Sequence, residues 1–166
     1  MPHNVLISLY NTLIHPYLEY CNIIWSLDRS SALNDLFICQ KKVIRIITNS
    51  YRTAHTSPIF KKLHILPLHS INDLQLGCFV YQCLNNQLPK YFCDMFKMNV
   101  NVHEHDTRHK YDLHSNGCTL YVRACTVRFA GVKLWNSLVK SANLQHALNM
   151  HQFKKGLKCW LLDMLQ

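Results

Sequence analysis

The sequence predicts a mostly α-helical protein, because apolar residues recur at helical spacing through much of its 166 residues. A hydrophobic content of 49% supplies enough apolar surface for a core, and only four glycines and five prolines interrupt the pattern. We expect three parts along the chain. A helical region covers residues 1–96, an exposed histidine-rich loop covers 97–118, and a short strand or hairpin with a C-terminal helix covers 119–166.

The first helical pattern runs from Val5 to Trp25, and Leu9 and Leu13 belong to its predicted apolar row. Pro16 interrupts this pattern, since proline lacks a backbone N–H and clashes with the preceding turn. We therefore expect either a kinked helix or two short helices in this segment.

A second helix is predicted to begin after an N-cap at Ser30-Ser31. Its predicted inward row consists of Leu33, Leu36, Phe37, Gln40, Val43, Ile44 and Ile47. A polar loop and a short helix over 58–63 follow, with Pro58 in the first turn, where proline is tolerated. Ser70-x-x-Asp73 resembles a capping box and predicts a further helix, which ends at Asn85-Asn86.

The later segments are less regular. Residues 89–96 predict one more short turn of helix, and residues 97–118 hold four of the 11 histidines and few aliphatic side chains. Residues 119–129 alternate in a β-like manner and predict a strand or hairpin. A turn or short helix over 131–138 and a final helix over 147–165 complete the prediction.

The charge is strongly positive, with 18 Lys and Arg against nine Asp and Glu, for a net charge of +9. The basic residues form two acid-free stretches, 41–62 with six cations and 113–162 with seven. Such stretches attract phosphate backbones, although a solvated and soluble surface has the same composition.

Other classes of protein are excluded or disfavoured. No apolar run approaches the roughly 20 residues of a membrane-spanning helix, and no secretion signal opens the chain. We therefore expect an intracellular protein that binds no membrane. The eight cysteines include no CxxC pair, so free, buried thiols are favoured over a disulfide framework.

Seven segments stand in a particular order along the chain. They are LYNTLIHPYLEYCNIIW (9–25), LFICQKKVIRII (36–47), HTSPIFKKLHILPL (55–68), DLQLGCFVYQCLNNQLP (73–89), TRHKYDL (107–113), RFAGVKLWNSL (128–138) and FKKGLKCWLL (153–162). Together they resemble the region that follows the polymerase core in the reverse transcriptases of LINE-type (non-LTR) retrotransposons. Two positions depart from that pattern, because Val132 and Val139 stand where the family usually has proline.

The resemblance implies a helical, thumb-like and post-polymerase region that helps to hold an RNA template or an RNA/DNA duplex. The polymerase reaction needs clustered aspartates that hold two metal ions. This chain contains neither the family's Tyr-x-Asp-Asp pattern nor any Asp-Asp pair. We therefore expect a non-catalytic fragment of such an enzyme, without a cofactor or a metal.

The expected activity is binding of RNA or DNA backbones without sequence preference. The candidate binding residues are Lys41, Lys42, Arg45, Arg52, Arg108, Arg123, Arg128, Lys154, Lys155 and Lys158. Arg108 is singled out for a phosphate contact or a buried ion pair, because it lies in the TRHKYDL segment. Tyr51 and Arg52 are the favoured base-stacking residues, because they stand in a polar, basic loop.

Two motifs have a plainer reading beside the functional one. His103, His105, His109, His114 and Cys118 resemble a zinc ligand set, but structural zinc sites use closer pairs, so a loop is favoured. The tryptophans Trp25, Trp135 and Trp160 stand at helical spacing among aliphatic residues and predict packing rather than base stacking.

Two alternatives remain open at the level of sequence. The chain is either a protein-interaction or dimerisation module, whose apolar surface once met the missing polymerase core, or a translated transposon remnant without function. A large exposed apolar patch favours the first alternative, and the lack of a cooperative unfolding transition favours the second.

Overall fold

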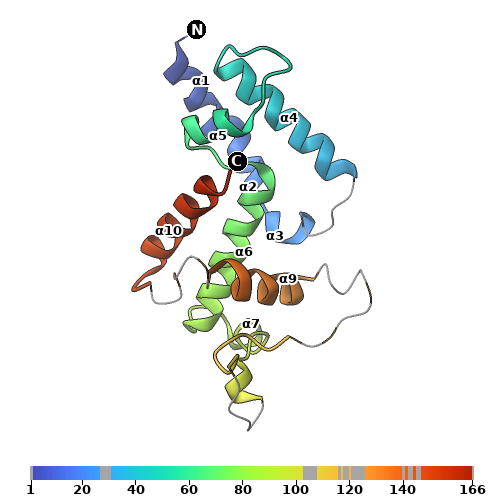
Figure 1. Ribbon diagram of the computed structural model, residues 1–166, viewed down its shortest axis with the longest axis vertical. Helices are drawn as coiled ribbons and strands as arrows, with labels where there is room; N and C mark the ends of the chain where they lie inside the picture. The colour runs from blue at the N-terminus through green and yellow to red at the C-terminus, as the bar shows by residue number, and fades with distance from the viewer. Residues whose placement is uncertain are drawn as a thin grey trace. The chain divides into compact units, whose positions relative to one another are not determined.

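The computed structural model describes residues 2–26, 31–102, 108–115, 117, 120, 126–139, 141, 144 and 147–165. These residues are mostly helical and form no β-sheet, which confirms the predicted class (Figure 1). In chain order the helices are α1 (His3–Leu9), η1 (Tyr10–Ile14), α2 (His15–Glu19), α3 (Asn22–Trp25), α4 (Ser31–Ile47), α5 (Ser57–Leu63), α6 (Leu68–Leu84), α7 (Lys90–Cys93), η2 (Asn99–Asn101), α9 (Val127–Leu134), η3 (Trp135–Val139) and α10 (Met150–Asp163).

Contacts divide the chain into two compact units. Unit 1 comprises residues 1–73 and 158–166, and unit 2 comprises residues 74–157. The boundaries fall inside α6 and α10, so each of these helices contributes residues to both units. The three-part division of the sequence at 96 and 118 follows composition rather than contacts, and it stays a prediction.

Pro16 interrupts the first helix as expected. The turn before it, η1, widens to a π-helical turn, in which His15 N–H donates to the Tyr10 carbonyl five residues back. This wider turn breaks the regular α-helical spacing, and Tyr10 is buried while Leu9 and Leu13 are exposed. The prediction that Leu9 and Leu13 lie in the inward row is therefore wrong.

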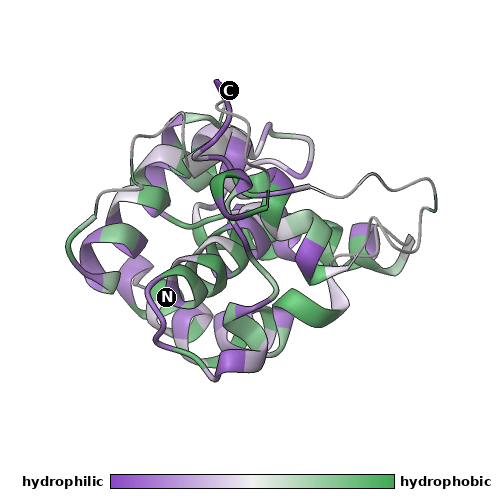
Figure 2. Cartoon of the chain, turned by 90° about the horizontal axis from the view of Figure 1, so that it is seen from below, coloured by the Kyte–Doolittle hydropathy of each residue, from purple (hydrophilic) through white to green (hydrophobic). Residues whose placement is uncertain are grey.

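The core of unit 1 is built on α4. Ile44 and Ile47 pack with Tyr10, Phe60 and Ile65, which come from η1, α5 and the segment after α5. The predicted inward row of α4 is confirmed at its main positions, with Leu36 as the exposed exception. Figure 2 shows the mixture of apolar and polar residues around the helices that such one-sided burial requires.

One buried amide joins four segments of unit 1. Gln40 is 2% exposed. Its Nε2 donates to the Tyr10 hydroxyl and to the Leu66 carbonyl, both at 3.0 Å, and its Oε1 accepts from Leu68 N–H at 2.8 Å. The backbone N–H of Leu68 opens α6, so the cap of this helix comes from α4. The predicted cap at Ser70 is wrong, because Ser70 lies inside α6.

Three helices end in the same way without glycine. Asn49, His64 and Asn86 follow α4, α5 and α6 with φ angles of 50°, 53° and 54°. After α5, His64 N–H donates to the Lys61 carbonyl and Ile65 N–H donates to the Phe60 carbonyl. This pair of bonds is the Schellman motif, which satisfies carbonyls at the end of a helix. The predicted stop at Asn85-Asn86 is confirmed.

The core of unit 2 is aromatic. Phe153 is fully buried, and both Tyr81 and Trp135 stack on its ring, with centroids 4.4 and 5.9 Å apart. Gly131 brings α9 close to α6, because a Cβ at this position would lie 2.9 Å from both Val80 and Phe96. The residues of α6 in this unit are buried on several sides, as expected of a central helix.

The loop after α7 is closed rather than extended. An antiparallel bridge joins Met98 to Leu113, and His114 N–H donates to the Lys97 carbonyl at 2.7 Å. Asn136 in η3 holds the same loop, since its amide exchanges two 2.9 Å hydrogen bonds with the backbone of Leu113. Most of the described residues of the predicted loop over 97–118 are exposed, and these backbone and side-chain bonds anchor them.

The predicted strand or hairpin over 119–129 is wrong at its end, because residues 127–129 form the first turn of α9. Residues 118, 119 and 121–125 lie outside the described part of the chain. The predicted helices over 131–138 and 147–165 are present as the continuation of α9 into η3 and as α10. Within α10, Phe153, Leu157 and Leu161 are buried.

Candidate nucleic-acid interface

The first group of candidate residues lies on α4 and the loop after it. Because α4 turns Gln40, Ile44 and Ile47 into the core, Lys41 and Arg45 flank the buried row and Lys42 is exposed. Lys41 Nζ lies 4.1 Å from the centre of the Phe37 ring, and Arg45 Nε donates to the Ala54 carbonyl at 3.0 Å. The α4 surface, defined as Lys41, Lys42, Arg45 and Arg52, is therefore partly ordered by its own contacts.

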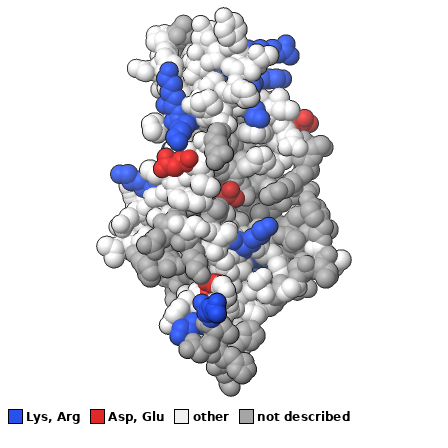
Figure 3. Space-filling view, viewed as in Figure 1, with Lys and Arg blue, Asp and Glu red and all other residues white. Residues whose placement is uncertain are grey.

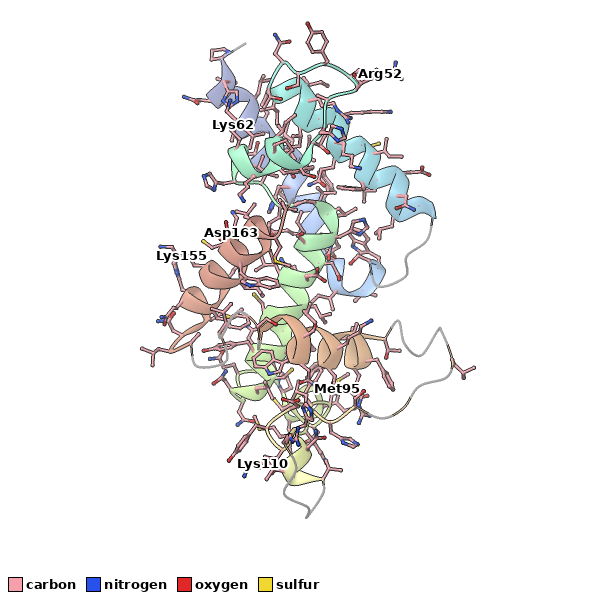
Figure 4. The ribbon with its side chains drawn as sticks, in the orientation of Figure 1. Arg52, Lys62, Met95, Lys110, Lys155 and Asp163 are labelled. Carbon is pink, nitrogen blue, oxygen red and sulfur yellow. The ribbon has the colours of Figure 1, made fainter. Side chains whose placement is uncertain are left out.

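Arg52 stands in the loop between α4 and α5, where Figure 4 shows its side chain near one end of unit 1. Arg45 ties this loop back to α4 through the bond to Ala54. Tyr51 precedes Arg52 and is 88% exposed, the position expected of a ring that is free to stack on a base. The loop thus carries an exposed tyrosine and an exposed arginine at consecutive positions.

The α4 surface carries uncompensated positive charge. None of its four cations pairs with a carboxylate of the described residues. Farther along, Lys61 lies 4.0 Å from Asp163 at the end of α10, an exposed pair of small energetic value. Figure 3 shows Lys and Arg in several groups on the face in view, with Asp or Glu close to some of these groups.

The remaining described candidates lie on other elements, and of these only Lys158 is assigned to unit 1. Lys154, Lys155 and Lys158 are exposed along α10, whose opposite residues Phe153 and Leu157 are buried. Arg108 and Arg128 are exposed in unit 2. Arg108 is therefore not buried, and it has no ion pair with a carboxylate of the described residues. Arg123 lies outside the described residues.

Sequence reasoning missed one concave, basic site in unit 2. A pocket of about 420 Å³ is lined by Met95, Lys97, Asn101, Val102, His114 and Arg128. Only Arg128 was a candidate. The backbone bridge of the closed loop brings Lys97 and His114 together, and no spacing pattern in the sequence predicts that bridge.

A second cavity, of about 410 Å³, lies in unit 1 beside a buried polar cluster. Asn22, Ser26 and Asn72 form this cluster: Ser26 Oγ donates to Asn22 Oδ1 at 3.0 Å, and Asn72 Nδ2 contacts both residues. Asn22 also donates to the Leu18 carbonyl at 2.8 Å. The cluster satisfies its own polar atoms and joins α3 to α6, which is a structural role.

The aromatic residues divide into packed and exposed sets. Trp135 is buried and stacks on Phe153, which confirms the packing prediction for this residue. Trp25 is partly buried, and its indole N–H donates to the Tyr20 carbonyl at 2.7 Å. Trp160 is also partly buried. Tyr17, Tyr20 and Tyr91 are exposed and retain the freedom to stack.

The six described cysteines are free, as predicted, although only Cys78 and Cys83 are buried and three are exposed. Burial, with a smaller contribution from the nearby Cys93, raises the pKa of the Cys83 thiol to about 11. Such a thiol is a poor nucleophile near neutral pH. Burial likewise raises the pKa of Tyr10, and the hydrogen bond from Gln40 opposes that change.

Among the described residues, no three metal-binding side chains come together. His109 Nδ1 lies 2.7 Å from Asp112 Oδ2, whereas His103, His105 and Cys118 lie outside the described residues. The helices that the structure describes include none with the length and hydropathy of a membrane span. No family model, curated protein or solved structure matches this chain.

Proposed function

We propose that this chain binds RNA or an RNA/DNA duplex through the phosphate backbone, without reading the base sequence. The single observation that supports the proposal is the α4 surface, where four cations without carboxylate partners among the described residues adjoin an exposed tyrosine. Binding to a phosphate backbone needs positively charged side chains, and a helix can present several of them in fixed positions. Contacts to phosphates carry no information about the base sequence.

The resemblance to the LINE-type reverse transcriptases adds a context to this activity. We propose that the chain is a non-catalytic, thumb-like and post-polymerase segment of such an enzyme, which would hold the template while chemistry occurs elsewhere. The collinear order of seven segments supports this origin. Within the described residues, the folded chain brings no three acidic or other metal-binding groups together.

Fluorescence anisotropy with a short RNA/DNA duplex, measured across a salt series, tests the proposal. We expect the logarithm of the binding constant to fall linearly with the logarithm of the salt concentration. Replacing Lys42 and Arg52 together by Gln should reduce the slope by about 2, because each of these cations neutralises one phosphate. Lys90→Gln with Lys133→Gln removes two exposed charges from unit 2 and is the matched control. Absence of binding at low salt would refute the proposal.

A specific observation favours self-association as a second candidate function. Large exposed apolar side chains recur every three or four residues from α1 to α3, and Tyr17 and Ile24 are 79% and 75% exposed. The members of this row, the N-terminal apolar row, are Val5, Leu9, Leu13, Tyr17, Tyr20 and Ile24. Glu19 is the single Lys, Arg, Asp or Glu between residues 2 and 26, so two copies of a basic chain would meet little repulsion there.

Sedimentation velocity tests this second candidate. A dimer that Leu13→Glu converts to a monomer would support it, because a charge in the N-terminal apolar row is costly to bury. Ile38→Glu, at an exposed position on α4 outside the row, is the control. A chain that stays monomeric at high concentration would leave backbone binding as the remaining proposal.

A further inference from the structure

The pocket in unit 2 is built by the closed loop after α7. Its two sides are held together by the Met98 to Leu113 bridge, by the bond from His114 N–H to the Lys97 carbonyl, and by a 2.9 Å bond from Asn99 N–H to the Asp112 carbonyl. These backbone bonds bring residues 97 and 114, which are far apart in sequence, to the same wall. Met95, which lines the pocket, is labelled in Figure 4.

Asn136 links this wall of the pocket to the helix that supplies Arg128. Its side-chain amide donates to the Leu113 carbonyl and accepts from Leu113 N–H, both at 2.9 Å. Asn136 belongs to η3, which continues directly from α9, and Arg128 lies in the first turn of α9. These bonds and the continuity of α9 with η3 therefore fix the backbone of Arg128 relative to the loop that carries Lys97 and His114.

The lining combines cations with an apolar wall. Lys97 and Arg128 are positive, His114 and Asn101 are polar, and Met95 and Val102 are apolar. The described lining residues include no carboxylate. Arg can form two parallel bonds to phosphate oxygens, whereas Lys acts as a point charge, so the pair suits one phosphate group.

The imidazole of His114 is oriented by its neighbours. Asn99 Nδ2 donates to the His109 carbonyl at 2.9 Å, which identifies Asn99 Oδ1 as an acceptor. His114 Nδ1 lies 3.0 Å from that oxygen and therefore carries the proton in this bond. The ring is thus held against the loop.

We propose that this pocket, the 97–128 pocket, binds one nucleotide through its terminal phosphate. Arg128 and Lys97 hold the phosphate, Met95 and Val102 contact the sugar or base, and Asn101 offers amide donors and an acceptor. A volume of about 420 Å³ suits one nucleotide and is too small for a duplex. The inference deepens the proposed function and rests on it, because it names a strand end as the ligand that the pocket takes.

Binding experiments distinguish the sources of the phosphate. The probes are inorganic phosphate, uridine monophosphate, and one labelled RNA oligonucleotide carrying either a 5′-phosphate or a 5′-hydroxyl group. We expect the phosphorylated strand to bind at least tenfold more tightly than the hydroxyl strand, and uridine monophosphate to compete with it more strongly than inorganic phosphate. Equal affinity for both strands would overturn the proposal.

Substitutions locate the effect. Arg128→Gln and Lys97→Gln should each remove most of the preference for the 5′-phosphate, whereas Lys133→Gln, an exposed neighbour on α9, should leave it unchanged. Thermal unfolding of each variant checks that the fold is retained. A preference that survives both pocket substitutions would overturn the inference.

The same variants separate this inference from the proposed function. If Lys42→Gln with Arg52→Gln abolishes duplex binding while the pocket variants behave as wild type, the 97–128 pocket is refuted and the α4 surface stands. If the pocket variants alone lose the 5′-phosphate preference and duplex binding ignores the α4 surface, the proposed function fails and the pocket stands.

Discussion

Different kinds of contact hold the helices together inside unit 1 and inside unit 2. In unit 1, buried amides set the positions of the helices: Gln40 bonds three partners, and Asn22 and Asn72 form a second polar cluster. In unit 2, stacked rings on Phe153 and the close approach at Gly131 do so. Hydrogen bonds are directional, whereas ring packing depends on volume, so the two units should respond differently to the same kind of substitution.

The largest expected effect is in unit 2. Phe153→Ala removes the ring on which Tyr81 and Trp135 stack, and it should cost about 4 kcal/mol of unfolding free energy, within the usual range for a buried phenylalanine. Urea unfolding measures the change. His151→Ala, at an exposed position on α10, is the control. A loss below about 1 kcal/mol would show that packing does not dominate this unit.

Gln40→Leu tests the polar joint of unit 1. The substitution keeps the volume but leaves the Tyr10 hydroxyl, the Leu66 carbonyl and Leu68 N–H without their partner. Buried groups stranded in this way cost about 1–3 kcal/mol each, partly offset by the added apolar surface, so we expect a loss of about 3 kcal/mol. Hydrogen exchange at Leu68 should accelerate more than in Cys39→Ala, an exposed control. Unchanged stability would mean that shape alone holds unit 1.

Alkaline pH should weaken both units through one group in each. The pKa of Tyr10 in unit 1 is raised from 10.0, and that of Cys83 in unit 2 is raised from 9.0 to about 11. Each group binds its proton more tightly in the folded chain, so its contribution is intact below the unfolded pKa and is lost as the pH rises through the folded pKa. Urea unfolding at a series of alkaline pH values that spans these pKa values should show this decline.

A substitution at Cys83 measures how much of the loss of stability at alkaline pH comes from its buried thiol. Cys83→Ala should reduce the decline in stability above the unfolded pKa of 9.0, whereas Cys21→Ala, at an exposed cysteine, should leave it unchanged. An identical pH profile in both variants would show that the Cys83 thiol titrates at the same pH in the folded and the unfolded chain.

The smallest expected effect concerns a helix end in unit 1. His64 has a φ of 53° after α5, in the left-handed region that disfavours side chains with a Cβ. His64→Gly should stabilise the chain by up to about 1 kcal/mol, because glycine adopts this conformation freely. Asn49→Gly should gain less, since asparagine already tolerates it. Thermal unfolding compares the two variants, and destabilisation by His64→Gly would assign the imidazole a further role.

The reach of sequence reasoning differs between neighbouring elements. The short helix after Pro58, the stop at Asn86 and the inward position of Ile44 all follow from local rules, and each is present in the structure. The exposure of Leu13 did not follow, because this residue lies in the π-helical turn before Pro16, which alters the periodicity on which the prediction depended.

The candidate site shows the same contrast. Lys41, Lys42 and Arg45 could be placed beside the buried row of one helix from spacing alone, because a single helix fixes their relative positions. The sequence could not predict that Lys97, His114 and Arg128 line one pocket. That arrangement depends on the Met98 to Leu113 bridge and on the amide of Asn136, which join three separate segments.

The sequence by itself determined the helical class, the sites where most helices stop, and the excess of basic residues on α4, because these depend on interactions within a few residues. Only the tertiary structure decided where α6 begins, since its first N–H is bonded by Gln40 from 28 positions earlier. It also decided which cations share a pocket. Contacts between distant segments satisfy buried polar groups in ways that no local pattern encodes, and those contacts supply both the polar joint of unit 1 and the 97–128 pocket of unit 2.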